Sequence, residues 1–379
     1  MLSCGEPSGD LYAGALAREL LARTPGTEIV GFGGDRLRDA GARLVGHFRG
    51  ISVTGLTEAL RVLPRSFAMI RQLVEEARAR RPDVFVAIDF PDFNFRLMAA
   101  LHKLGIPVVY YISPQLWAWR PWRMKTMKAL VDRVLVIFPF EEPLYRRAGV
   151  SVQFVGHPIM DVTPAAEARD SFLSTRGLDP AAPTIALLPG SRLNELHHIL
   201  PTLAAAVPLI RQRVPRAQFV VACAPHLDDA LFAPFAAGPG GPVLVHDRTD
   251  DVLAASDVVV TASGTATVQA ALHERPMVVV YRLSRLTYVL GKPFGLIDMY
   301  AMPNLIAGRR IVPELIQDGL TPERVAQEAV SYLTDPGRYA ATRAALQDVR
   351  ASLGDPGASG RAADAILEVA TKAASTINH

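Results

Sequence analysis

The chain has 379 residues, 50% of them hydrophobic and 20% charged, so it can bury large cores and is not a disordered protein. Its formal net charge is +3 and no dense basic face is visible, so no nucleic-acid partner is expected. The two cysteines, Cys4 and Cys223, form neither a CxxC motif nor a disulfide framework. The sequence has no run of about 18 apolar residues and no signal-peptide pattern, which favours a cytoplasmic protein.

The charge is spread unevenly along the chain. Residues 1–160 hold 21 Lys and Arg against 15 Asp and Glu, whereas the rest of the chain holds 19 against 22. The N-terminal part is therefore expected to meet an anionic partner, such as phosphates or a membrane surface.

Short, β-branched apolar runs alternate with helical patterns from one end of the chain to the other. The runs lie at 27–31, 84–88, 108–112, 134–138, 185–188, 219–222, 243–245, 258–261 and 278–281. Runs this short and continuous are typical of parallel strands that are buried on both faces. The sequence therefore predicts an α/β fold built from doubly wound sheets.

The strands fall into two groups, separated by a polar, Ala-rich stretch near 160–180. We expect one domain over 1–165 and a second over 166–350. Residues 351–379 are expected to form a C-terminal helix that either packs on the second domain or returns to the first. Because ligands of open α/β sheets bind at the carboxyl ends of the strands, two such domains predict a central cleft.

The first candidate motif, Gly-Glu-Pro-Ser-Gly-Asp at 5–10, leads from a strand into a helix. Glycines after a strand let backbone amides approach a ligand, and a helix N-terminus favours an anion. A plain turn with Ser8 or Asp10 as the N-cap explains the same pattern.

The second motif places carboxylates directly after a buried strand, in Asp89-Phe-Pro-Asp92-Phe-Asn94. A carboxylate at a strand tip, shielded by Phe90 and Phe93, suits a general base that accepts a proton from a hydroxyl. Alternatively, Asp92 and Asn94 cap the next helix and Asp89 accepts hydrogen bonds from loop amides.

The third motif, Ser-Pro-Gln-Leu-Trp-Ala-Trp-Arg at 113–120, holds two of the three tryptophans, and the third is Trp122. Large aromatic side chains are costly to expose, so we expect them to stack on a sugar or hold acyl chains. A hydrophobic plug between the domains is an equal alternative.

Two further strand–turn–helix motifs are Leu-Leu-Pro-Gly-Ser-Arg at 187–192 and Thr-Ala-Ser-Gly-Thr at 261–265. Turn amides, a helix N-terminus and the Arg192 guanidinium suit a diphosphate, although each motif is also consistent with a simple turn. Two such turns in one domain predict a nucleoside diphosphate. Asn304 and Gln317 are polar positions in apolar surroundings, and alone they would be helix caps.

Taken together, seven motifs in order resemble those of the lipid-A-disaccharide synthase family, inverting glycosyltransferases with the GT-B architecture of two Rossmann-like domains facing a cleft. They lie at 5–10, 88–94, 113–120, 154–158, 187–192, 262–267 and 303–308. The resemblance implies transfer of 2,3-diacylglucosamine from its UDP conjugate to the 6-hydroxyl of 2,3-diacylglucosamine 1-phosphate (lipid X). The products would be the β-1,6 disaccharide 1-phosphate of lipid A and UDP. Such a displacement needs no metal, and neither a metal nor a cofactor is expected.

The resemblance also implies roles for particular residues. Asp89 would be the general base on the acceptor hydroxyl. The nucleotide side of the site would comprise Ser191, Arg192, Ser263, Gly264, Thr265, Gln269, Asn304 and Gln317 in the second domain. The sugar and acceptor side would comprise Glu6, Ser8, Asp10, Gln115 and Trp117 in the first. Gln269 stands where a glutamate is expected in the family, but an amide can still bond a ribose hydroxyl.

Acylated substrates lie in a bilayer, so the enzyme is expected to reach an anionic membrane surface. Leu56, Leu60, Leu63 and Phe67 recur at helical spacing among basic residues, which favours membrane contact. A helix turned toward the core fits Phe67, Ile70, Val74 and Ala77 equally well. The expected location is peripheral, on the inner face of the inner membrane of a Gram-negative bacterium, with a homodimer as an open alternative.

Two other functions remain open from the sequence. A UDP-sugar epimerase of similar architecture would use the same UDP turns without a lipid substrate. A non-enzymatic nucleotide-binding protein would not need the Asp89 carboxylate. An NAD-type oxidoreductase is disfavoured, because no GxGxxG motif with a downstream acidic residue follows a strand.

Overall fold

The computed structural model describes residues 1–49, 56–116, 121–225, 227–236, 240–282 and 299–377, with only the backbone for 56–62, 236, 374, 376 and 377. The chain divides into two compact units. The first comprises Met1–Val162 together with Leu353–His379, and the second comprises Thr163–Ser352. The sequence placed the corresponding boundaries at 165/166 and 350/351.

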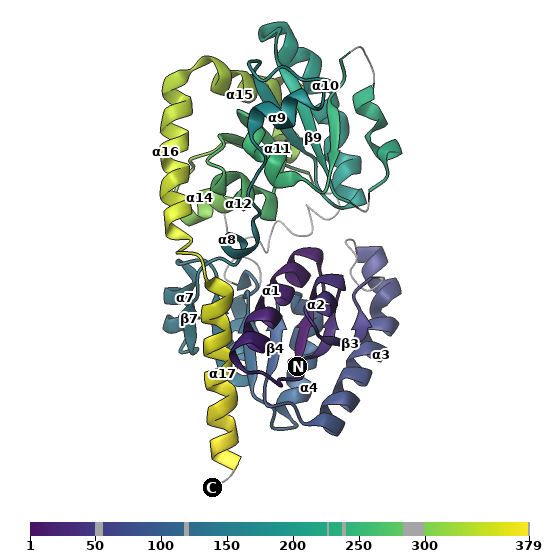
Figure 1. The fold of residues 1–379 in the computed structure, drawn as a ribbon, viewed down its shortest axis with the longest axis vertical. Coiled ribbons are helices and arrows are strands. Elements are labelled where there is room, and N and C mark those ends of the chain that lie inside the picture. The colour runs from purple at the N-terminus through teal and green to yellow at the C-terminus, as the bar shows by residue number, and fades with distance from the viewer. Residues whose placement is uncertain (50–55, 117–120, 226, 237–239, 283–298, 378–379) are drawn as a thin grey trace. The chain divides into compact units, whose positions relative to one another are not determined.

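The first unit contains, within the described residues, one sheet of seven parallel strands in the order β3-β2-β1-β4-β5-β6-β7 (Figure 1). The strands are β1 (Leu2–Cys4), β2 (Val30–Gly33), β3 (Arg43–His47), β4 (Phe85–Ile88), β5 (Val108–Tyr111), β6 (Arg133–Val136) and β7 (Val152–Phe154). The direction of the strand order reverses between β1 and β4. This reversal is the topological switch point, where ligands of open α/β sheets bind.

Helices connect these strands and cover both faces of the first sheet. They are α1 (Pro7–Arg23), α2 (Asp35–Asp39), α3 (Leu56–Arg80), α4 (Pro91–His102), η1 (Pro121–Arg123), α6 (Met124–Leu130), α7 (Glu141–Arg147), α8 (Ile159–Val162) and α17 (Ala358–Ile377). Proline is the first helical residue of α1 and α4, where its missing N–H costs nothing. The C-terminal α17 packs along α1, and the Arg23 guanidinium donates to Asp364 across that contact at 2.6 Å.

The second unit contains, in its described part, a sheet of six parallel strands in the order β10-β9-β8-β11-β12-β13. The strands are β8 (Thr184–Leu188), β9 (Gln218–Cys223), β10 (Val243–His246), β11 (Val258–Ala262), β12 (Met277–Tyr281) and β13 (Glu314–Ile316). The helices are α9 (Arg169–Ser174), α10 (Leu193–Arg213), η2 (Asp229–Ala236), α11 (Thr249–Ala255), α12 (Thr265–Leu272), α14 (Met302–Ala307), η4 (Gln317–Gly319), α15 (Pro322–Thr334) and α16 (Pro336–Ser352). Its switch point lies between β8 and β11.

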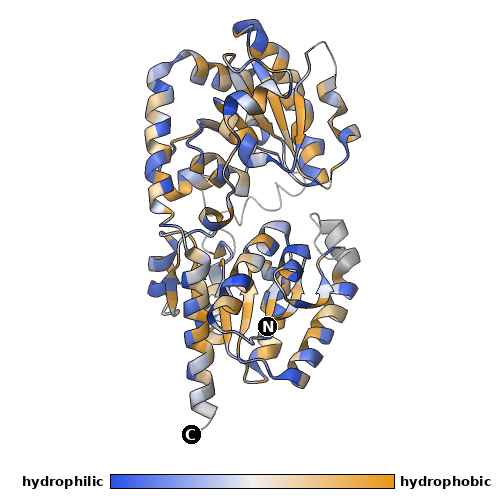
Figure 2. Cartoon of the chain, in the orientation of Figure 1, coloured by the Kyte–Doolittle hydropathy of each residue, from blue (hydrophilic) through white to orange (hydrophobic). Residues whose placement is uncertain are grey.

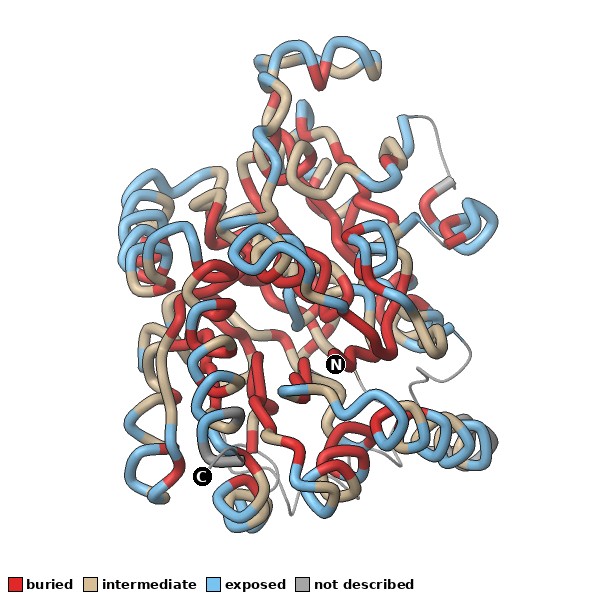
Figure 3. The backbone as a smooth tube through the Cα atoms, turned by 60° about the horizontal axis from the view of Figure 1, so that its bottom comes forward, coloured by how far each residue is buried: buried red, intermediate tan, exposed pale blue. Residues whose placement is uncertain are grey.

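Both sheets are buried on both faces, which explains the continuous apolar runs (Figures 2 and 3). Alternate residues of β8 divide between two cores: Ile185 and Leu187 belong to one, and Ala186 and Leu188 to the other. The predicted α/β fold with doubly wound sheets is therefore confirmed. The apolar runs do not predict β3, β7 or β13, which lie at sheet edges and are only partly buried.

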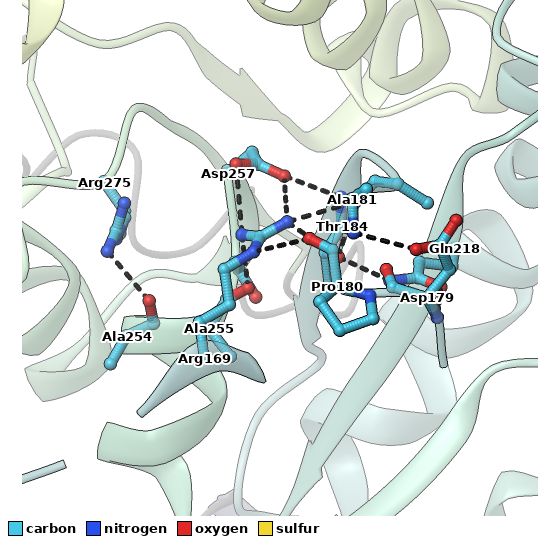
Figure 4. Close-up of polar contacts among 12 residues, drawn as sticks. Arg169, Asp179, Pro180, Ala181, Thr184, Gln218, Ala254, Ala255, Asp257 and Arg275 are labelled. Atoms are coloured by element: carbon cyan, nitrogen blue, oxygen red, sulfur yellow. Dashed lines mark hydrogen bonds and ion pairs between the residues drawn. The ribbon is translucent and has the colours of Figure 1, made fainter. Parts of the chain in front are cut away.

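A hydrogen-bonded hub, formed by Arg169, Asp257 and Thr184, lies at the amino-terminal edge of the second sheet (Figure 4). The Arg169 guanidinium meets both carboxylate oxygens of Asp257, at 3.1 and 3.0 Å, and donates to the carbonyls of Ala255 and Ala182. Asp257 also accepts from the Thr184 amide at 2.8 Å. The hub ties α9 to the starts of β8 and β11, at the edge opposite the one where ligands of such sheets bind.

His157 is a buried ionisable group of the first unit, 3% exposed, in the segment after β7. Its Nδ1 accepts from the Ile159 amide at 3.1 Å, and its ring packs edge-on against Tyr12. Burial lowers the pKa of His157 from 6.5 to about 3, although the nearby Asp161 carboxylate opposes the shift. The folded protein therefore holds this imidazole neutral.

Acid should destabilise the first unit through His157. In the unfolded chain the imidazole takes up a proton below pH 6.5, whereas the folded form stays neutral down to a pH of about 3, so protons favour the unfolded state. The expected loss is about 2 kcal/mol of unfolding free energy at pH 5 relative to neutral pH. Urea unfolding of the wild type and of His157→Gln, which keeps an acceptor but does not titrate, measures the effect. Equal losses in the two proteins would contradict it.

Candidate active site

The first two sequence motifs meet at the switch point of the first sheet. Cys4 and Ile88 are paired across β1 and β4, so the turns that begin at Gly5 and Asp89 lie side by side. A Cβ atom on Gly5 would overlap the aromatic ring of Phe90. Only glycine fits at this close approach, which joins the two motifs into one packed edge.

Asp89 leaves β4 in an unusual backbone conformation. Asp89 and Phe90 have φ angles of 44° and 49°, in the left-handed region that non-glycine residues rarely adopt. Such residues cost about 1–3 kcal/mol each and persist where the surroundings hold them. Asp89 is half-buried, and its amide donates to the Tyr111 carbonyl at 3.2 Å. The strain thus falls on the residue that the sequence singled out as a base.

The structure turns Asp10 toward the protein interior. Asp10 is 4% exposed, and its carboxylate accepts from the amides of Gly34, Arg36 and Leu37 at 2.7, 2.9 and 3.2 Å. Asp10 therefore caps the start of α2 and fastens it to α1. Glu6 and Ser8, at the beginning of α1, are half-buried.

The described residues on either side of 117–120 include one that contacts helix α4. Gln115, half-buried, follows β5, and Trp117 lies outside the described residues. Beyond it, the Arg123 guanidinium donates to Asp92 at 2.8 Å and stacks over Phe95, with 4.9 Å from Cζ to the ring centroid. Arg123, three residues beyond the third motif, is thereby tied to α4, the helix that follows Asp89.

In the second unit, the turn after β8 is occupied by a carboxylate of the chain itself. The amides of Ser191 and Arg192 donate to Glu195 at 3.0 and 3.3 Å, and the Arg192 guanidinium lies 3.4 Å from the same side chain. Gly190, with φ of +121°, brings the chain around Glu195. The sequence assigned these amides to an anionic ligand and missed Glu195. Its position three residues after the N-cap was the available signal.

The turn after β11 lies beside this one, because Leu188 and Thr261 are paired across the two strands. Ser263 donates its hydroxyl to the Tyr300 carbonyl at 2.9 Å. Gly264 and Thr265 are exposed at the N-terminus of α12, and Gly264 has a φ of 151°. These exposed backbone positions are available to an anion. One turn further along α12, Gln269 is half-buried.

Asn304 is completely buried, and both polar atoms of its side-chain amide make hydrogen bonds within the chain. Oδ1 accepts from the amides of Ile311 and Val312 at 2.7 and 3.0 Å, and Nδ2 donates to the Val312 carbonyl and to Glu314. Glu314 in turn accepts from the Tyr300 amide. Asn304 and Glu314 together shape the chain around α14, and the sequence did not single out Glu314.

Two further groups end neighbouring strands on the same edge. Gln317 follows β13, is half-buried with a φ of 53°, and its carbonyl accepts from Arg282 at 3.3 Å. Tyr281 ends β12, and burial together with the nearby Glu195 carboxylate raises the pKa of its hydroxyl, opposed by Arg192. Tyr281 therefore lies close to the Arg192–Glu195 pair, and the sequence missed it because it continues an apolar run.

Comparison with known proteins decides the family. Residues 1–369 match the family described as lipid-A-disaccharide synthetase. The chain belongs to this family. A lipid-A-disaccharide synthase of Myxococcus xanthus (strain DK1622) is 42% identical over 370 residues, which is 97% of each chain. A synthase of the same name from Anaeromyxobacter dehalogenans (strain 2CP-C) is 46% identical over 371 residues, again 97% of each. The predicted class, a glycosyltransferase of lipid A disaccharide synthesis, is confirmed.

Similarity to solved structures supports the GT-B fold for this chain. The kitacinnamycin glycotransferase superposes with a TM-score of 0.65 at 21% identity, covering 97% of this chain and 98% of that one. The UDP-GlcNAc 2-epimerase of Neisseria meningitidis superposes with a TM-score of 0.67 at 13% identity and the same coverage. At these identities the likeness concerns the fold alone, and the family match does not favour the epimerase alternative.

The apolar residues of helix α3 are divided between the core and the surface. Leu73 and Ala77 are fully buried, whereas Phe67 is 50% exposed beneath the Arg96 guanidinium. Leu63 is half-buried. For Leu56 and Leu60 only the backbone is described, as part of α3.

Two further properties concern all the described residues together. Among them, no cluster of three or more His, Cys, Asp or Glu side chains is arranged to hold a metal ion. Among the same residues, no helix is both long and apolar enough to span a membrane.

Replacing Gly190 by Ala should weaken UDP binding at least about tenfold. Alanine is strained at a φ of +121°, and its Cβ would lie 2.7 Å from the Glu195 Cβ, so the turn must deform. Isothermal calorimetry with UDP measures the loss. Gly177→Ala is the matched control, because Gly177 also has a positive φ, of +69°, but a Cβ there would meet no atom within 4 Å. Wild-type affinity in Gly190→Ala would show that the turn takes no part in binding.

Proposed function

We propose that this chain transfers 2,3-diacylglucosamine from UDP-2,3-diacylglucosamine to the 6-hydroxyl of 2,3-diacylglucosamine 1-phosphate (lipid X). The products are the β-1,6-linked lipid A disaccharide 1-phosphate and UDP. The family match across residues 1–369 carries the proposal, since it covers both switch points and their motifs. Its UDP-sugar lipid substrate follows from membership of the family.

Asp89 is proposed as the general base. Its carboxylate takes the proton of the acceptor 6-hydroxyl as that oxygen attacks the anomeric carbon of the donor. The bond from this carbon to the diphosphate breaks on the opposite side, and the anomeric configuration inverts. The half-buried position at a strained strand end supports this role, because a fixed carboxylate loses little freedom on reaching the reactive geometry.

The second unit is proposed to stabilise the leaving UDP. The Arg192 guanidinium, at the start of α10, offers a charge-assisted contact to the diphosphate. Gly264 and Thr265 offer exposed backbone at the start of α12, with Ser191 and Ser263 in the two turns. Charge stabilisation of this kind is sufficient for the leaving group, so the proposal gives no role to a metal or cofactor.

The remaining polar positions are proposed to bind the sugars and the nucleotide. Glu6, Ser8, Gln115 and Trp117 line the acceptor side, with Asp10 shaping the turn beneath them. On the nucleotide side, the proposal places Gln269 and Gln317 against the ribose and base. Asn304 supports that side through the chain around α14.

Product formation should be independent of metal and should need both Asp89 and Arg192. We expect Asp89→Ala to lower kcat by about 10²–10⁴-fold and Arg192→Ala by about 10²–10³-fold, through loss of the base and of leaving-group stabilisation. The assay follows disaccharide and UDP in detergent with EDTA. Asp92→Asn, on an exposed carboxylate of the same loop, is the matched control. Wild-type turnover in folded Asp89→Ala would remove the base role, and UDP binding without product would favour a non-enzymatic protein.

We infer that the enzyme is peripheral on the inner face of the inner membrane of a Gram-negative bacterium. The half-exposed Phe67 and the exposed Arg65, Arg71 and Arg78 of α3 support contact with an anionic surface. Leu56, Leu60 and Leu63 belong to the same proposed contact. A homodimer stays a prediction.

Phe67→Ser should reduce binding to anionic vesicles several-fold with little change in Tm, because the side chain is 50% exposed. Cosedimentation with phosphatidylglycerol vesicles measures the bound fraction. Leu231→Ser, at a 37% exposed leucine of the second unit, is the matched control and should bind like the wild type. Unchanged binding of Phe67→Ser would contradict this contact.

A further inference from the structure

A buried set of hydrogen bonds converges on the Asp89 backbone carbonyl. The Tyr110 hydroxyl donates to this oxygen at 2.8 Å, and the Asn94 side-chain amide donates to it at 2.7 Å. Asn94 is itself held by Ser3, whose hydroxyl donates to Asn94 Oδ1 at 2.7 Å. Ser3, Asn94 and Tyr110 each have 0% exposure. We call this set of three residues the carbonyl clamp.

The clamp fixes the peptide group that follows Asp89, one of the two that set the direction of the Asp89 side chain. The Asp89 carbonyl belongs to the peptide plane between Asp89 and Phe90, so its orientation determines ψ of Asp89 and φ of Phe90. Both residues are in the left-handed region, at φ 44° and 49°. Two donors occupy both acceptor directions of the carbonyl oxygen, and this holds the plane in its strained orientation.

The clamp draws on three elements around the switch point. Ser3 comes from β1, Asn94 from α4 and Tyr110 from β5. Burial raises the pKa of the Tyr110 hydroxyl well above its ordinary value, with the Asp89 charge adding to the shift, so the hydroxyl stays a donor at every working pH. A hydroxyl buried within an apolar strand needs a partner, and the Tyr110 hydroxyl finds one in the backbone carbonyl of the proposed base.

We propose that Tyr110 and Asn94 are positioning residues that aim the Asp89 carboxylate by holding its backbone carbonyl. The inference rests on the proposed role of Asp89 as the general base. It assigns no contact with substrate to either residue. Loss of the Tyr110 hydroxyl leaves Asn94 as the single donor, so the peptide plane rotates more freely and the carboxylate spends less time in the reactive direction.

Tyr110→Phe is the direct test, because it removes one buried oxygen and keeps the ring. We expect kcat to fall at least about tenfold, while KM for lipid X and stabilisation by UDP stay within about twofold of the wild type. Tyr111→Phe is the matched control. Tyr111 is the next residue of β5 and is also fully buried, but its hydroxyl lies near Ser359 of α17 and makes no hydrogen bond to the Asp89 carbonyl. It should keep wild-type kcat.

Asp89→Ala, assayed in parallel, separates the two proposals. If Asp89→Ala is inactive and Tyr110→Phe turns over as fast as Tyr111→Phe, the clamp is overturned and the base role stands. If folded Asp89→Ala keeps wild-type kcat, the base role falls and the clamp falls with it. Should Tyr110→Phe fail to fold, Ser3→Ala decides. It loosens Asn94 alone, so a loss of kcat at constant KM supports the clamp and wild-type kcat overturns it.

Discussion

The structure depends on the reversal of strand order inside each of two parallel sheets. Because both faces of each sheet are covered by helices, polar side chains are excluded from the strands and gather at their carboxyl ends. The strand order reverses between β1 and β4 and again between β8 and β11, so the chain leaves the two adjacent strands in opposite directions. In such sheets the ligand site lies between the two turns that follow these strands. Gly5 and Asp89 flank the first such place, and the turns after Leu188 and Ala262 flank the second.

Much of the chemistry in these turns serves to shape the protein. Asp10 has three acceptor bonds to α2, Asn304 uses its whole amide on the chain itself, and Glu195 takes the amides of the turn that precedes it. Backbone amides at helix starts must find partners, and a side chain of the chain serves as well as a ligand. The exposed backbone at Gly264 and Thr265 is therefore the stronger candidate for a diphosphate.

These cases show which features of the site cannot be predicted from the sequence. The central strands and the fold class follow from apolar runs, because a strand buried on both faces can hold little else. The edge strands β3, β7 and β13 lack such runs, and their residues are mostly only partly buried. A motif shows that Asp10 or Asn304 is polar and follows a strand. The motif does not show whether the side chain contacts a ligand or a backbone amide of another segment of the chain.

Tyr110 is the opposite case, a residue whose role the sequence does not indicate. It lies in an apolar run, and this pattern predicts only a core residue. Its ring does belong to the core, while its hydroxyl reaches the Asp89 carbonyl on the neighbouring strand. Gly5 is linked to the same peptide from the other side, because the Phe90 ring fills the space that a Cβ would need. A strained turn held by a ring contact on one side and by two donors on the other has few alternative conformations. The two N-terminal motifs therefore form one packed unit, whose shape depends on Asn94 within the second motif and also on Ser3 and Tyr110, which neither motif contains.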